Sequence, residues 1–154
     1  MLAAFDSNVL VYSRLEPDGA KGSRSIDLLE RAGFVGGVFP VQVLGEFLWV
    51  VRRRRLDLYP FAVRTLESLP PTIQTPASTR EAMAEAAILV GRYGLQFWDA
   101  LICVAAAMAA ATHLLSEDMQ DGFTVAGLTI VNPFAEANRN LLDRLLPPLP
   151  TASG

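Results

Sequence analysis

Short apolar runs alternate with longer amphipathic stretches along this chain of 154 residues. The first run, residues 2–5, leads directly into Asp6, and it predicts a short buried strand over 2–6. Ser7 or Asn8 is expected to cap the turn that follows this strand. Similar runs predict further strands at 34–39, 72–75, 113–116 and 128–131.

Apolar residues at helical spacing predict helices between these strands, with Ser78 to Glu81 resembling a capping box. The expected helices cover 23–32, 40–54, 57–68, a segment that ends near 93–94, a segment that starts near 97, and 135–146. This alternation predicts an α/β fold, a three-layer sandwich with a mostly parallel central sheet flanked by helices. We interpret 1–146 as one domain and 147–154 as a proline-rich flexible tail.

Four carboxylates stand inside apolar sequence: Asp6, Glu46, Asp99 and Asp118. Burying an ionised group without a partner costs several kcal/mol. Few cations lie near these acids in the sequence, so a divalent metal ion is the natural partner. Asp6 and Asp118 follow predicted strands, where ligands bind in parallel sheets, and the other two lie near helix starts that face the same edge. One pocket is therefore expected to hold all four.

The composition excludes several other classes of site. Cys103 and His113 are the only residues of their kinds, which excludes an internal disulfide, zinc fingers and Cys–His nucleophile pairs. We expect both to have structural roles. No phosphate-binding GxxxxGK[ST] loop is present. The net charge of -3 argues against a protein that coats nucleic acid, but a nuclease needs only a local basic face.

No segment of the sequence has the features of a membrane span or a signal peptide. The longest uncharged apolar run, 100–111, is short compared with the roughly 20 residues that a span requires. No basic residue precedes an apolar stretch at the N-terminus. The expected location is therefore the cytoplasm.

Hard oxygen ligands suit Mg²⁺ or Mn²⁺, and such ions can activate water and orient a phosphodiester. Hydrolysis of a nucleic-acid backbone is the reaction class that this set of acids serves best.

The four acids and their surroundings, FDSNVL, VLGEF, FWDALI and LLSEDMQDG, resemble the acidic quartet of PIN-domain ribonucleases, and most of all the VapC toxins of toxin–antitoxin pairs. This resemblance implies a metal-dependent endoribonuclease that acts on RNA, is inhibited by a cognate antitoxin and often forms a homodimer. It also implies that the four acids bind Mg²⁺ or Mn²⁺. Ser116 matches a small hydroxyl residue of the family. Many members have one more acid where this chain has Gln120, so Asp121 is a candidate for a further metal ligand.

Two features could contact RNA or a partner. The basic run 52–55 could follow phosphates, contact an acidic antitoxin, or simply complement the negative end of a helix. Trp49 and Trp98 could stack on bases, although core packing is the more common role of tryptophan.

Two other functions remain open at this stage. A haloacid-dehalogenase-like phosphatase would need a second aspartate two positions after Asp6, where this chain has Asn8, and a lysine near the phosphate. The single lysine, Lys21, lies in a turn-rich stretch early in the chain, and a receiver domain would lack its late lysine in the same way. The other alternative is a non-catalytic interaction module whose carboxylates hold a structural ion.

Overall fold

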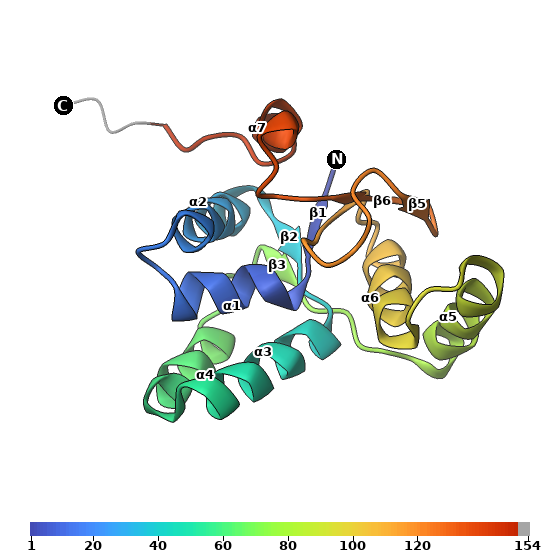
Figure 1. The fold of residues 1–154 in the computed structure, drawn as a ribbon, viewed down its shortest axis with the longest axis horizontal. Helices are drawn as coiled ribbons and strands as arrows, with labels where there is room; N and C mark the ends of the chain where they lie inside the picture. Colours follow the sequence, from blue (N-terminus) through green and yellow to red (C-terminus); the bar gives the residue numbers. More distant parts are fainter. Residues whose placement is uncertain (151–154) are drawn as a thin grey trace.

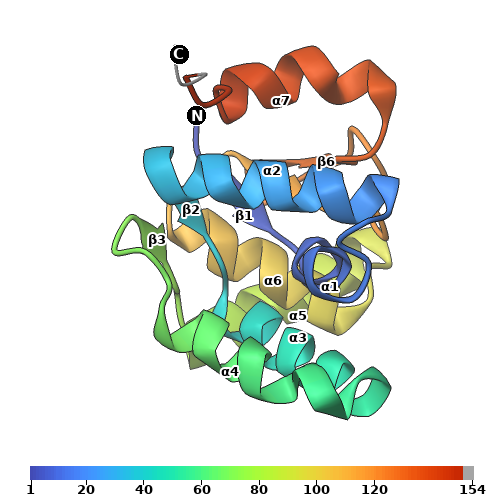
Figure 2. The same ribbon diagram turned by 90° about the vertical axis from the view of Figure 1, so that its left-hand side faces the viewer.

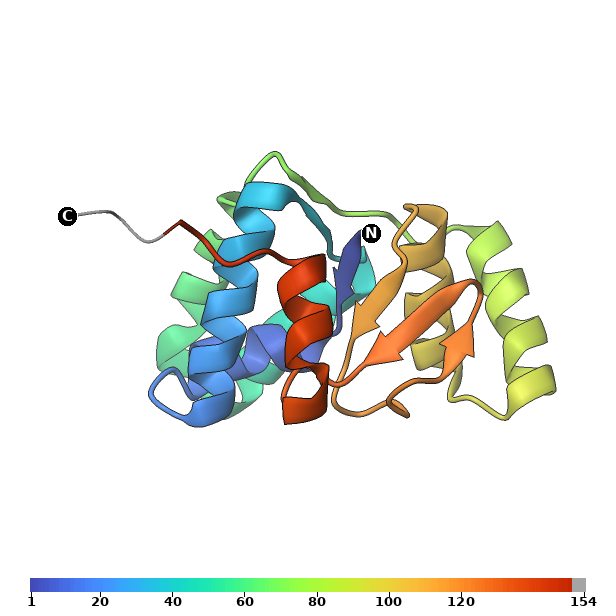
Figure 3. The same cartoon turned by 90° about the horizontal axis from the view of Figure 1, so that it is seen from above.

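A computed structural model describes residues 1–150 and contains a six-stranded sheet flanked by helices. The strands are β1 (Ala3–Phe5), β2 (Gly37–Val38), β3 (Ile73–Gln74), β4 (His113–Leu115), β5 (Thr124–Val125) and β6 (Leu128–Val131). They are arranged in the order β3-β2-β1-β4-β6-β5, and Figure 3 shows β1, β4, β6 and β5 side by side. All neighbouring pairs are parallel except β5 and β6. The mostly parallel α/β sheet expected from the sequence is therefore confirmed.

The helices are α1 (Ser7–Leu15), α2 (Ala20–Val35), α3 (Val41–Arg54), α4 (Tyr59–Glu67), α5 (Arg80–Tyr93), α6 (Phe97–Met108) and α7 (Arg139–Leu145), with short 3-10 turns at Leu56–Leu58 and Glu136–Asn138. Helices α2 and α7 cover one face of the sheet, whereas α6 lies against the other (Figures 1 and 2). Helix α1 packs on both α2 and α3, and α5 packs on α6. This arrangement confirms the three layers.

The predicted strand at 34–39 was too long. Helix α2 continues through Val35, and Gly36, with φ of 100°, ends it, so only Gly37 and Val38 pair in the sheet. The side chains of Phe34 and Val35 are exposed, which suits the end of a surface helix better than a buried strand. Apolar character alone did not separate the two structures.

Two predicted caps were also wrong by one position, and the segment after Asp6, predicted as a turn, is the helix α1. Asp6 caps α1, since its side chain accepts a hydrogen bond from the Ser7 backbone N–H at 2.7 Å. Thr79 caps α5 by accepting from the Ala82 N–H at 3.1 Å, so Ser78 is not the cap. Both caps still fulfil the expected physical role, because each satisfies a backbone donor at the start of a helix.

The sequence pattern did not reveal β5, which forms a hairpin with β6. Ala126 and Gly127 connect the two strands, and both have positive φ, 53° and 76°. Two such residues are typical of the tight turns whose twist matches that of the flanking strands. An alanine is uncommon at positive φ, so the turn was hard to recognise from residue types.

Helix α2 is fixed to α7 by a buried arginine that the sequence did not single out. Arg31 is 8% exposed and donates to Asp27 at 2.9 Å and to Asp143 at 2.7 Å. Its guanidinium also donates to the Leu146 carbonyl at 3.1 Å. Asp27 and Asp143 therefore pair a buried charge.

Gly22 is the position where α1 and α2 come closest. A Cβ at this position would lie 1.7 Å from the backbone oxygen of Glu16, so the backbone would have to move. We expect Gly22→Ala to lower the free energy of unfolding by at least about 2 kcal/mol, measured by urea denaturation, because overpacking against backbone is strongly destabilising. Gly91→Ala is the control, since a Cβ there meets nothing within 4 Å and alanine favours the helix. Equal stability of the two variants would contradict the close approach.

Residues 147–150 have no regular secondary structure, and 151–154 lie outside the described residues, so the domain boundary and the flexible tail remain predictions. Within residues 1–150, every helix falls short of the length and apolar character that a membrane span requires.

Candidate active site

The candidate site lies at the switch point of the sheet, where the chain, after adding β2 on one side of β1, adds β4 on the other side. Strand β1 has β2 on one side and β4 on the other, and all three are parallel, so their carboxyl ends meet at one edge. Asp6 directly follows β1, and Ser116 and Asp118 follow β4. The crevice at such a switch point is the usual ligand site of open parallel sheets. The sequence predicted this position for Asp6 and Asp118.

Asp6 is the most buried acid of the group, with 5% of its surface exposed. Ser116 Oγ donates to its Oδ2 at 2.7 Å, and the Ser7 backbone N–H donates to Oδ1. Burial nevertheless raises the pKa of Asp6 to about 6, and the charges of Glu46 and Asp99 add to this rise. The hydrogen bonds only partly offset these effects.

Glu46 reaches the same edge from α3, and two neighbours orient it. Ser7 Oγ donates to Oε2 at 3.0 Å, and the Gln42 amide, one turn earlier on α3, donates to Oε1 at 3.0 Å. The same Gln42 amide also contacts the Trp98 carbonyl at 3.4 Å, which links α3 to the start of α6. Glu46 is half-buried, consistent with the predicted inward helix face.

Asp118 is joined to Asp6 through one amide group. The Nδ2 of Asn8 lies 3.3 Å from an oxygen of each carboxylate, so the two oxygens are no more than twice that distance apart. Ser116 Oγ accepts from the Asp118 backbone N–H at 3.2 Å while it donates to Asp6. Ser116 thus ties the loop after β4 to the acid after β1.

Asp99 lies in the first turn of α6, as predicted. Burial raises its pKa above the usual value, and the charges of Glu46 and Asp118 raise it further. Asp99 lines a pocket together with Asp118. Since Ser7 and Asn8 link the other three acids to one another, the four predicted acids lie at the same edge of the sheet.

Asp121 has different partners. Its Oδ1 accepts from the Asn132 backbone N–H at 2.7 Å, and both of its oxygens accept from the Asn138 amide at 3.0 Å. These contacts tie the loop after β4 to the segment before α7. They give Asp121 a structural role, and its role as a metal ligand remains a prediction.

Three residues at the site were not singled out from the sequence. Ser7, Asn8 and Gln42 donate hydrogen bonds that hold the acids. Gln42 could have been found from its spacing, because it lies four residues before Glu46 on one helix face. Asn8 could not have been found in this way, because Asp118, the second acid that it contacts, lies 110 residues away.

The donor set fits a hard divalent cation. All four acids offer carboxylate oxygens, and within residues 1–150 none of the four forms an ion pair with lysine, arginine or histidine. Two amide oxygens beside them, Asn8 Oδ1 and Gln42 Oε1, are buried without a hydrogen-bond partner. In the described part of the chain, however, no three His, Cys, Asp or Glu side chains stand together as a ready-made metal cluster. The chemistry fits Mg²⁺ or Mn²⁺, and the binding itself remains a prediction.

Cys103 and His113 do not change this oxygen-rich character. Cys103 is buried in α6, and burial, with the charges of Asp99 and Asp6, raises the pKa of its thiol to about 12. The thiol therefore stays protonated at neutral pH and is a poor metal ligand. His113 belongs to β4, where burial lowers its pKa, as expected for a structural residue.

Lys21 is held away from the four acids by Glu117. Its Nζ forms an ion pair with Glu117, and the Tyr12 hydroxyl donates to the same carboxylate at 2.8 Å. Partial burial opposes the ionisation of Glu117, but the bonds from Lys21 and Tyr12 outweigh it and lower its pKa. This cluster anchors the residue next to Asp118. It also disfavours a haloacid-dehalogenase-like site, because the only lysine is occupied elsewhere.

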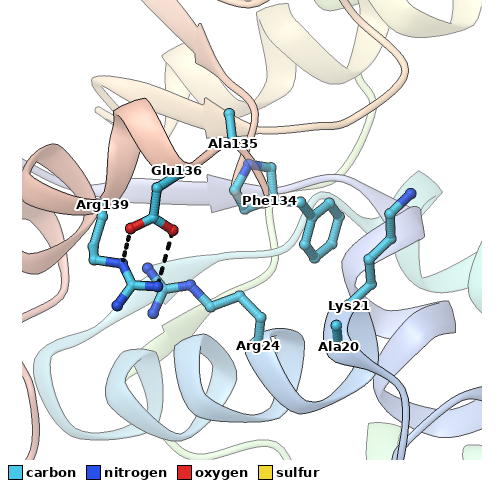
Figure 4. Close-up of a pocket in the computed structure, with 8 residues that line it drawn as sticks. Ala20, Lys21, Arg24, Phe134, Ala135, Glu136 and Arg139 are labelled. Carbon is cyan, nitrogen blue, oxygen red and sulfur yellow. Dashed lines mark hydrogen bonds and ion pairs between the residues drawn. The ribbon is translucent and has the colours of Figure 1, made fainter.

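A separate pocket of about 370 Å³ lies beside this cluster, between the start of α2 and the segment before α7 (Figure 4). Its cations are all paired within the protein. Arg139 binds Glu136 through two bonds of 3.0 Å, Arg24 binds Asp27 at 2.9 Å, and Lys21 binds Glu117. The pocket therefore offers no free charge for a ligand.

Comparison with known proteins identifies the fold. The chain superimposes on one from a toxin–antitoxin complex of Klebsiella pneumoniae with a TM-score of 0.61 and 21% identity, covering 85% of this chain and 97% of that one. It also superimposes on VapC20 of Mycobacterium tuberculosis, described as a sarcin–ricin loop cleaving toxin, with a TM-score of 0.61 and 15% identity, covering 75% and 91%. This chain has the PIN-domain fold of the VapC toxins. No protein-family model and no curated protein matches the sequence.

The PIN-domain fold confirms the resemblance drawn from the four acids as far as architecture is concerned. Identities of 21% and 15% establish a fold and not an activity, because one fold serves many functions. The function must therefore be argued from the acids, and from how the PIN-domain sheet brings them to one edge.

Proposed function

We propose that this protein is a metal-dependent endoribonuclease that acts as the toxin of a toxin–antitoxin pair. The observation that carries the proposal is the position of four acids at the switch point of a PIN-domain sheet. Ser7, Asn8 and Ser116 hold Asp6, Glu46 and Asp118 there, and Asp99 lines a pocket together with Asp118. The neighbours support the same function, since one is described as an RNA-cleaving toxin and the other belongs to a toxin–antitoxin complex.

The residues of the chain have separable roles in this proposal. The four acids would hold Mg²⁺ or Mn²⁺, which, when bound, lowers the pKa of a coordinated water and stabilises charge on the phosphodiester. Asn8 links the carboxylates of Asp6 and Asp118, and Gln42 orients the carboxylate of Glu46. Ser116 fixes Asp6 against the loop that carries Asp118. Asp121 stabilises that loop from its other side.

The direct test is cleavage of a labelled single-stranded RNA by the purified protein in the presence of Mg²⁺ or Mn²⁺. Internal cleavage that EDTA stops supports the proposal. Metal binding without cleavage of any RNA would instead favour the non-catalytic module.

Expression in bacteria tests the biological role: we expect growth arrest, relieved by a protein encoded next to this one. The homodimer and the cytoplasmic location are further expectations that size-exclusion chromatography and fractionation can check.

Glu46→Gln is expected to lower cleavage about 10- to 100-fold while the protein stays folded. The substitution keeps the shape of the side chain and an acceptor oxygen for Gln42, and its new amide group can donate to the Ser7 hydroxyl, but it removes one negative charge from the site. Initial rates at saturating metal measure the effect, and circular dichroism checks the fold. Glu85→Gln on the exposed surface of α5 is the matched control and should cleave like the wild type. Wild-type activity of Glu46→Gln would show that Glu46 is not a ligand of the proposed metal ion.

A further inference from the structure

A groove of about 570 Å³ opens beside Asp118, between α1 and α3, which lie side by side in Figure 1. One wall comes from α1, beginning with Ser7 and Asn8, and the other comes from the end of α3. Asp118 also lines the groove, so the groove leads directly to the candidate active site.

The α3 wall presents an aromatic ring and positive charge together. Trp49 is 61% exposed, and the guanidinium of Arg53 lies 5.2 Å from the centre of its ring. Arg54 lines the same groove. Within the described residues, neither Arg53 nor Arg54 forms an ion pair, whereas Arg55 is bound to Asp57. The expectation that tryptophan at this position packs in the core was wrong, and the same holds for Trp98, which is 54% exposed.

We propose that this groove binds the single-stranded RNA substrate, with Trp49 stacking on an unpaired base and Arg53 and Arg54 contacting adjacent phosphates. This proposal rests on the proposed function, because it names the form of RNA that the same site would bind and the residues that would bind it. An exposed tryptophan beside free arginines is the combination that single-strand binding surfaces use. A base that stacks on one face of the Trp49 ring leaves Arg53 on the other face, where its positive charge interacts favourably with the ring. Duplex RNA offers no free base and is expected to bind weakly.

Binding is tested without cleavage, by fluorescence anisotropy of a labelled single-stranded RNA in EDTA. Trp49→Ala is expected to weaken binding about tenfold, which matches the lower part of the range for base stacking on aromatic residues. Trp49→Phe should recover most of the affinity. The double variant Arg53→Ala/Arg54→Ala should flatten the dependence of log affinity on log salt by about 0.7 for each phosphate that the protein no longer neutralises.

Helix α4 offers a matched control outside the groove. Phe61 is 50% exposed, and Arg64 lies 4.5 Å from the centre of its ring. Phe61→Ala and Arg64→Ala remove the same kinds of group and are expected to leave RNA affinity unchanged. Affinities of Trp49→Ala equal to the wild type, or losses equal to those of the α4 controls, would overturn the proposal.

Three further outcomes distinguish this proposal from its alternatives. Specific binding in EDTA without cleavage in Mn²⁺ would refute the proposed nuclease but retain the RNA groove. Cleavage in Mn²⁺ that Trp49→Ala and the arginine variants leave intact would retain the nuclease and refute the groove. If poly-glutamate of equal charge competes as well as RNA and Trp49→Ala has no effect, the groove is a surface for acidic protein segments instead.

Discussion

Asp6→Asn is expected to reduce RNA cleavage at least about 1,000-fold and, in the same molecule, to stabilise the metal-free fold at neutral pH. Asp6 interacts with residues from every part of the site. Ser116 and Asn8 donate hydrogen bonds to it, and the charges of Glu46 and Asp99 raise its pKa in addition to burial. Removing its charge therefore removes the central proposed metal ligand. A loss of this size, several kcal/mol in activation free energy, is typical of groups that stabilise charge in the transition state.

The stability gain follows from the raised pKa of Asp6. Its pKa is about 6 in the folded protein and 3.8 in the unfolded chain, so the folded state binds the proton more tightly. The contribution of Asp6 to stability is therefore full below pH 3.8 and is lost as the pH rises through 6. At pH 7 the ionised residue costs roughly 3 kcal/mol, from 1.36 kcal/mol per pKa unit, and asparagine avoids most of this cost.

Urea denaturation in EDTA between pH 4 and pH 7 measures this effect. The difference in free energy of unfolding between Asp6→Asn and the wild type should grow as the pH rises to about 6 and then level off. Asp18→Asn, at an exposed position in the turn before α2, is the matched control and should show no such trend. A difference that does not change with pH would mean that burial does not raise the pKa of Asp6. Wild-type cleavage by the variant would refute the proposed active site.

Removal of divalent cations is expected to abolish cleavage, and their return is expected to stabilise the protein. A bound cation offsets the burial, and the smaller mutual repulsion, that raise the pKa of Asp6 and Asp99. At a metal concentration 100 times the Kd, metal binding raises the free energy of unfolding by about 2.7 kcal/mol. A domain of this size gains roughly 2 to 4 °C in Tm for each kcal/mol. Mn²⁺ should therefore raise the Tm by about 5 to 10 °C.

Thermal unfolding with increasing Mn²⁺ tests this prediction, and cleavage assays with EDTA and then excess Mn²⁺ test the activity. Asp6→Asn and Asp99→Asn should both lose the thermal shift, whereas Glu85→Gln, on the exposed surface of α5, should keep it. An unchanged Tm at millimolar Mn²⁺ in the wild type would contradict a cation site at these acids. A shift that survives in Asp6→Asn would place the cation elsewhere.

Local sequence determined the architecture of this protein and the positions of its acids. Alternating apolar runs and amphipathic segments predicted a parallel α/β sheet, because buried strands and surface helices have different periodicities. An acid within a few residues after an apolar strand lies near the carboxyl edge of such a sheet, and this rule located Asp6 and Asp118 from residue order alone. Element ends were less certain at 34–39, because an exposed helix end and a short strand can have the same residues.

Only the tertiary structure decided how the acids are held and what surrounds them. Asn8 joins Asp6 to Asp118 across 110 positions, and Glu117 binds Lys21 across 96, and no local pattern encodes such pairings. The exposure of Trp49 was equally hidden, because a tryptophan in an apolar helix is buried or exposed according to what packs against it. Residue types fix which chemistry is available, whereas burial, charge and partners depend on contacts between segments that are distant in sequence.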